Sequence, residues 1–91
     1  MGMGAAIESK LTAALSPSRM TVIDESHRHA GHAGARPEGE SHYRVEIVSA
    51  AFAGCSRVDR QRMVYAALAE EFAAGLHALA LTTRTPEEDG E

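Results

Sequence analysis

Three successive patterns in the second half of the chain predict a strand, a long helix and another strand. Residues 42–49 alternate between polar and apolar side chains, the period-two pattern of a strand with one buried face. Apolar residues then recur at helical spacing from Ser56 to about Ala74, and Gly75 is suited to end the helix. The apolar run 77–83 has the length of a strand. This order favours a right-handed crossover that makes the two strands parallel neighbours.

The long helix is predicted to be amphipathic. Ser56 is suited to be its N-cap, and the carboxylate of Asp59 follows at the third helical position. Six residues are assigned to its apolar face: Val58, Val64, Tyr65, Leu68, Ala69 and Phe72. We therefore expect the side chains of Tyr65, Leu68 and Phe72 in the core.

The first half of the chain adds a helix and a strand. Apolar residues at helical spacing predict a helix over about residues 4–15, which Pro17 ends. The β-branched and apolar run 20–23 predicts a strand that reaches Asp24. The resulting order of helix, strand, strand, helix and strand predicts an α+β fold, with a mixed three-stranded sheet and helices packed on one face.

The length of 91 residues fits a single domain. We expect a folded core over about residues 5–86 and an acidic tail over residues 87–91. Thr85 is suited to open a last helical turn, after which residues 89–91 are predicted to be disordered.

Composition and charge exclude several classes of protein. Hydrophobic residues make up 44% of the chain and charged residues 24%, so neither disorder nor a membrane span is indicated. The chain has no long apolar run, no signal-peptide pattern and one cysteine, Cys55, which together predict a cytoplasmic protein. The net charge of -4 comes from the four acids of the tail, because the remaining nine acids equal the nine Lys and Arg residues. The folded body therefore lacks the basic footprint of a typical nucleic-acid binder.

Four of the five histidines lie in a segment that is predicted to be a loop. Glycines and a proline recur from Ser26 to His42, at a density that a strand or helix would not tolerate. The histidines of the segment are His27, His29, His32 and His42, and the fifth is His77. By spacing alone, solvated imidazoles are the simpler interpretation and a metal site is the alternative. A structural zinc site is disfavoured, because such sites take four Cys or His ligands at stereotyped spacing and this chain has no second cysteine.

Three arginines cluster at the start of the predicted long helix. Backbone N–H groups at a helix start favour anions, so Arg57, Arg60 and Arg62 are candidates for contact with nucleic-acid phosphates. Their directions around the helix diverge, and ordinary solvated charges are the simpler interpretation. Cys55 is interpreted as a small residue in a turn rather than as a redox-sensitive thiol. No motif positions a base or a nucleophile, so no catalytic residue is predicted.

Five motifs follow one another along the chain. They are DESHRHAGH, ESHYRVEIVS, F-x-G, R-x-R-M-V-Y-x-x-L-x-x-E and G-x-H-A-L-A-L-x-T-x-T-P-E-E. In this order they resemble the BolA-like proteins over about residues 5–88. The resemblance implies a fold of the class II KH type. It also implies a role either in iron–sulfur handling with monothiol glutaredoxins or in DNA-linked transcriptional regulation of stress response and cell morphology.

The resemblance further implies a [2Fe–2S] cluster shared with a monothiol glutaredoxin and its glutathione. His77 matches the histidine of the H-A-L motif, and His29 matches the loop histidine of the bacterial BolA branch. These two are the expected ligands, with His32 and His42 as alternates, since iron–sulfur centres accept histidine in place of cysteine. The chain departs from the family at Gln61, where a histidine is frequent, and at Cys55, where a lysine is frequent.

The resulting expectation is a non-enzymatic accessory protein of iron–sulfur metabolism that is a monomer or a weak homodimer and does not bind membranes. The alternative is a DNA-binding transcriptional regulator that uses Arg57, Arg60 and Arg62. The lost positive charge at the two departures weakens the expectation of nucleic-acid binding and leaves the iron–sulfur expectation intact.

Overall fold

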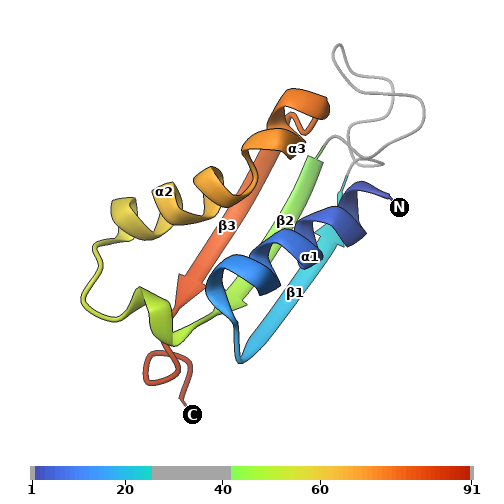
Figure 1. The fold of residues 1–91 in the computed structure, drawn as a ribbon. Coiled ribbons are helices and arrows are strands. Elements are labelled where there is room, and N and C mark those ends of the chain that lie inside the picture. The colour runs from blue at the N-terminus through green and yellow to red at the C-terminus, as the bar shows by residue number, and fades with distance from the viewer. Residues whose placement is uncertain (1, 26–41, 91) are drawn as a thin grey trace.

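The computed structural model describes residues 2–25 and 42–90, and its elements follow the predicted order (Figure 1). The elements are α1 (Met3–Leu15), β1 (Arg19–Asp24), β2 (His42–Val48), the 3₁₀ turn η2 (Ala50–Phe52), α2 (Arg57–Ala67), α3 (Ala69–Ala74) and β3 (Ala78–Arg84). The predicted α+β fold is confirmed. No helix in the described ranges is long and apolar enough to cross a membrane.

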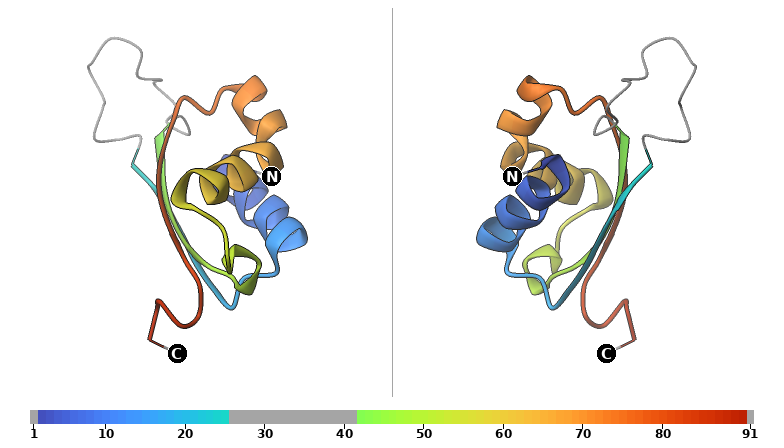
Figure 2. Two further views of the ribbon diagram at one scale, coloured as in Figure 1. Left: turned by 90° about the vertical axis from the view of Figure 1, so that its left-hand side faces the viewer. Right: turned by 90° about the vertical axis from the view of Figure 1, so that its right-hand side faces the viewer.

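The sheet has the strand order β1-β2-β3, with β2 in the centre. β1 pairs with β2 in the antiparallel sense, and β3 pairs with β2 in the parallel sense with His42 opposite Ala78. The side views show that all the helices in residues 2–25 and 42–90 lie on one face of the sheet, and none of them lies on the other face (Figure 2). The predicted mixed three-stranded sheet, covered on one face, is therefore confirmed.

The core lies between the sheet and the helices. Tyr43, Val45 and Ile47 point from β2 toward the helices, and none of them is more than 4% exposed. Burial of alternate residues is the predicted pattern of β2. The other buried apolar residues that pack together in this core are Ile7, Leu11, Leu15, Phe52, Val64, Leu68 and Leu76.

The helix predicted from Ser56 to Ala74 is instead divided at Leu68. Ser56 is its N-cap as predicted, and its hydroxyl accepts a hydrogen bond from the N–H of Asp59. At the break, the N–H of Leu68 is shared between two carbonyl groups of the preceding turn, at 3.1 and 3.2 Å. The second piece, α3, ends at Gly75, whose φ of 127° favours glycine.

Ion pairs hold α3 against α1. The Nζ of Lys10 lies 2.6 Å from Glu70 and 3.2 Å from Glu71, whose side chain is only 9% exposed. Hydrogen bonds to these two carboxylates raise the pKa of Lys10, and the bond to Lys10 lowers the pKa of Glu70. These contacts join α3 to α1 through residues that are far apart in the sequence.

The buried face of α2 differs from the predicted one. Val64 and Leu68 are fully buried, whereas Val58 is 54% exposed, Tyr65 is 38% exposed and Ala69 is exposed. Val58 and Tyr65 are seven residues apart and thus share one stripe, about 100° around the helix from the face that meets the core. The assignment of Tyr65 to the core was therefore wrong, because periodicity identifies a stripe without stating which neighbour it meets.

The C-terminal residues form an ordered turn. The N–H of Thr85 donates to the carboxylate of Glu88 at 2.9 Å, and the N–H of Glu88 donates to the hydroxyl of Thr85 at 3.2 Å. This reciprocal pair is a capping box at the predicted start of the turn. Asp89, which was predicted to be disordered, instead forms ion pairs with Arg19 and Arg84.

Truncation of Leu68 tests the observed orientation of the helix. Leu68→Ala should lower the free energy of unfolding by about 2–5 kcal/mol, because it removes a fully buried side chain and leaves a cavity. Val58→Ala should change the free energy of unfolding by no more than about 0.5 kcal/mol, because Val58 is exposed. Chemical denaturation followed by circular dichroism measures both. Equal losses in the two variants would contradict the orientation.

Candidate functional site

Two histidine side chains lie next to each other where β2 and β3 begin. His42 is the first residue of β2, and His77 directly precedes β3 on the neighbouring strand. The centroids of their imidazole rings are 5.2 Å apart, with the ring planes tilted by 53°. The side chain of His77 is exposed and that of His42 is half-buried. A predicted ligand and one of its predicted alternates are thus brought together.

The segment with the other histidines begins and ends at this same end of the sheet, where β1 ends and β2 begins. The N–H of Glu25 donates to the carbonyl of His42 at 2.8 Å, so the chain leaves β1 and enters β2 at one place. The predicted ligand His29, its alternate His32 and His27 lie outside the described residues. Their attachment points nevertheless lie beside the pair formed by His42 and His77.

The described part of this end supplies two imidazole donors for a metal. Within residues 2–25 and 42–90, no three or more His, Cys, Asp or Glu side chains are arranged to hold a metal ion. Cys55 follows the opposite end of β2, after η2. Two nitrogen donors match the number of histidines on one iron of a Rieske-type [2Fe–2S] centre, and the other ligands of such a centre must come from elsewhere.

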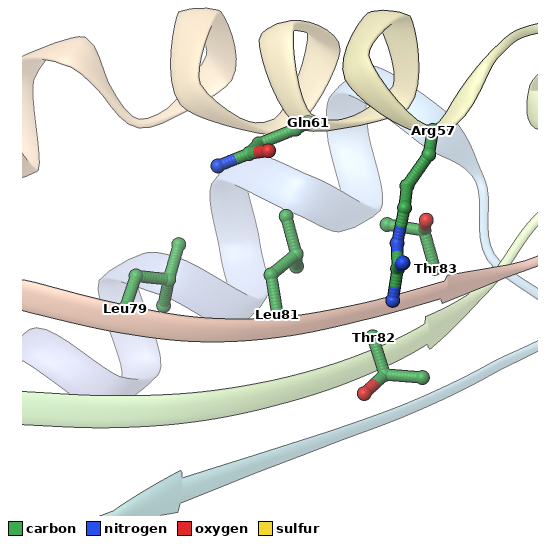
Figure 3. A pocket seen from close by; sticks show the side chains of 6 residues that line it. All are labelled: Arg57, Gln61, Leu79, Leu81, Thr82 and Thr83. Carbon is green, nitrogen blue, oxygen red and sulfur yellow. The ribbon is translucent and has the colours of Figure 1, made fainter.

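The three arginines that were predicted to contact nucleic acid face different surroundings. Arg60 is 13% exposed, and its guanidinium group forms two hydrogen bonds of 2.6 and 3.1 Å with the carboxylate of Glu88. Arg62 is 77% exposed and lies 3.6 Å from Asp59. Arg57 is exposed and points toward β3 (Figure 3). Arg57 and Arg60 both approach Thr83, whose carbonyl accepts a hydrogen bond from Arg60 at 3.5 Å, whereas Arg62 lies about 140° around the helix from Arg57.

Arg60 connects three parts of the domain. Its Nε donates to the carbonyl of Cys55 at 3.1 Å, and its guanidinium carbon lies 5.9 Å from the centre of the Phe52 ring. The bond to Glu88 raises the pKa of Arg60, and Arg60 together with the N–H of Thr85 lowers the pKa of Glu88 to about 2. A bidentate pair between arginine and a carboxylate has restrictive geometry. Arg60 therefore holds the C-terminal turn against the start of α2.

A pocket of about 150 Å³ lies between α2 and β3 (Figure 3). It is lined by Arg57, Gln61, Leu79, Leu81, Thr82 and Thr83. Apart from Arg57, these residues were not among the candidates from the sequence. No local pattern marks them, because the crossover from β2 through the helices to β3 creates the pocket. The role of Glu88 did have a local signal in the T-P-E-E sequence of a capping box.

Comparison with known proteins defines the family. The family model described as BolA-like protein matches residues 11–88. The chain belongs to the BolA-like protein family. This BolA-like chain is 52% identical over 89 residues to a Sinorhizobium protein called "Uncharacterized protein in cobS 5'region", with 97% of this chain and 96% of that protein covered. It is 48% identical over 82 residues to "DNA-binding transcriptional regulator BolA" of Escherichia coli, covering 90% and 74% of the two chains.

A solved BolA structure has the same fold as this BolA-like chain. The BolA domain of SufE1 from Arabidopsis thaliana superposes with a TM-score of 0.84 at 44% identity, covering 93% of each chain. The chain spans less of other relatives, for example 61% of BolA-like protein 1 from Pongo abelii. The resemblance inferred from the sequence motifs is therefore confirmed for both family and fold.

The pairing of Glu88 with Arg60 can be measured by titration. The side-chain carboxyl of Glu88 should titrate with a pKa of about 2, below its ordinary value of 4.5. The lowered pKa means that this contact stabilises the folded domain fully above pH 4.5 and is lost as the pH falls through about 2. Carbon-detected NMR of the carboxyl resonances gives the value. Arg60→Gln should shift it back toward 4.5, and an unchanged value in that variant would contradict the pairing.

Proposed function

We propose that this BolA-like protein acts as a non-enzymatic accessory protein that holds a [2Fe–2S] cluster jointly with a monothiol glutaredoxin and glutathione. The observation that carries the proposal is that the exposed His77 lies beside His42, at the end of the sheet where the histidine-rich segment leaves β1 and enters β2. His77 and His29 are the proposed ligands, and His32 and His42 are alternates. When bound, the cluster would accept and donate electrons, and it could be passed on to another protein.

The backbone around His77 is suited to present a ligand. Leu76 directly before it is 4% exposed and belongs to the core, and Ala78 directly after it pairs with His42. The position of the His77 backbone is therefore held from both sides, while its imidazole group is exposed. A ligand held by regular structure needs little reorganisation when it binds a metal.

His42 has two possible parts in this proposal. As a ligand, it would bind the same iron as His77, which the closeness of the two rings supports. As a neighbour, it would orient the imidazole of His77 while His29 completes the pair. In both cases each histidine that binds the iron must be neutral, because a protonated imidazole has no free nitrogen lone pair to bind a metal.

Spectroscopy of the mixed proteins tests the proposal. The protein is combined with a monothiol glutaredoxin, glutathione, ferrous iron and sulfide, and visible absorption and circular dichroism are recorded. The mixture should differ from glutaredoxin alone, and His77→Ala should remove the difference because it removes an exposed ligand. His27→Ala is the matched control and should leave the spectrum unchanged.

Two further variants identify the second ligand. Loss of the mixed spectrum in His29→Ala but not in His42→Ala would assign His29, and the reverse would assign His42. A mixture that has the spectrum of glutaredoxin alone, or a His77→Ala protein that behaves as the wild type, would refute the proposal.

DNA binding is the second candidate function. It is supported by the name of the Escherichia coli relative, a DNA-binding transcriptional regulator, and by the exposed side chains of Arg57 and Arg62. Arg60 is a weaker candidate than the sequence indicated, because Glu88 already binds its guanidinium group.

The salt dependence of binding separates these arginines. On a log–log plot of binding constant against salt concentration, Arg57→Gln and Arg62→Gln should each reduce the slope by about 1, since each removes one phosphate contact. Arg60→Gln should leave the slope unchanged because Arg60 is engaged by Glu88. Fluorescence anisotropy with a labelled duplex measures the slopes. Undetectable binding at low salt would rule out this function.

A further inference from the structure

The outer edge of β3 has backbone groups directed away from the sheet. β3 is the last strand of the order β1-β2-β3, so within the described ranges only β2 pairs with it. The N–H of Ser49, just after β2, donates to the carbonyl of Arg84 at 2.9 Å, which directs the backbone groups of Arg84 toward β2. Along a strand, the backbone N–H and C=O groups of successive residues point alternately to one side and to the other. Those of Leu79, Leu81 and Thr83 therefore point away from β2. The carbonyl of Thr83 already accepts a hydrogen bond from Arg60 at 3.5 Å, so the open part of the edge is at Leu79 and Leu81.

Helix α2 runs beside this edge, and the pocket of about 150 Å³ lies between them. Arg57 and Gln61 point from α2 toward the strand, while Leu79 and Leu81 point from the strand toward the helix (Figure 3). The pocket thus has a helix on one side and an unpaired strand edge on the other.

The pocket is apolar at one end and positively charged at the other. Leu79 and Leu81 are partly exposed in it, and the guanidinium group of Arg57 lies near Thr82 and Thr83 (Figure 3). Arg57 is exposed and forms no ion pair with any residue that the structure describes. Its charge is therefore available to a carboxylate from another molecule.

We propose that the edge of β3 and the facing side of α2 form a docking site for an extended, acidic peptide segment of a partner protein. The segment adds a strand to β3 through the backbone groups of Leu79 and Leu81, as in other cases of strand addition. Apolar side chains at alternate positions rest on these two leucines. The next residue on the same face is Asp or Glu, and its carboxylate binds Arg57.

The charges favour a peptide over a nucleic acid. Binding of a phosphate backbone uses several cations along a groove. Here Arg60 is bound to Glu88, and Arg62 points elsewhere and lies beside Asp59. One available cation beside two leucines matches a segment with a single acidic residue. The site goes beyond the proposed function, because it uses neither His77 nor a metal.

Backbone amides report occupation of the edge. The probes are acetylated and amidated peptides with the sequence Thr-Val-Thr-Val-Thr-Asp-Thr and its reverse, titrated into the metal-free protein without glutaredoxin. At least one should slow hydrogen exchange at the amides of Leu79 and Leu81. The amide of Ala80 should be unaffected, because it already points toward β2. Failure of both peptides would overturn this proposal and leave the cluster proposal unaffected.

Matched variants test the charge and the backbone contact separately. Arg57→Gln, or asparagine in place of the aspartate of the peptide, should weaken binding about two- to fivefold. The two changes together should weaken it no further. Arg62→Gln is the control and should have no effect. Methylation of the peptide nitrogens that face β3 should abolish binding even though the side chains are unchanged.

Two other occupants of the edge give different results. If oligothymidine shifts the same amides more strongly than the peptides do, the site belongs to a nucleic acid and the proposal is wrong. If exchange at Leu79 and Leu81 slows as the protein concentration rises without peptide, a second copy of the chain occupies the edge. That result would also overturn the proposal.

Discussion

The pairing of β2 with a strand on each side is the constraint on which the rest of the structure depends. Its buried face carries Tyr43, Val45 and Ile47 against the helices, so a shift of one residue would expose all three. This register places His42 opposite Ala78 and thereby sets its ring beside that of His77. The candidate metal site is therefore a consequence of burying the central strand.

Arg60 shows how an apparent binding residue can serve the fold. Its guanidinium group joins the carbonyl of Cys55, the ring of Phe52 and the carboxylate of Glu88. These contacts connect the start of α2 to η2 and to the C-terminal turn. They also remove one positive charge from the surface, which leaves Arg57 as the cation beside the open edge of β3.

Much of the fold could be predicted from the sequence because strand and helix periods are local properties. The alternation over residues 42–49 identified β2 and its buried face, and the resemblance to BolA-like proteins identified the family. The helix face was partly wrong, since Tyr65 lies on a stripe that neighbouring elements leave exposed. The ion pairs of Lys10 and of Glu88 join distant residues, so no local period could reveal them.

The sequence by itself determined the order of helices and strands, the family and the residue types available for metal binding. Only the tertiary structure decided which of these residues meet. It set His42 beside His77, bound Arg60 to Glu88 and opened the pocket between α2 and β3. The physical reason is that local patterns report the conformation of a segment. Contacts between segments depend instead on sheet register and on the crossover that carries β3 to the far side of β2.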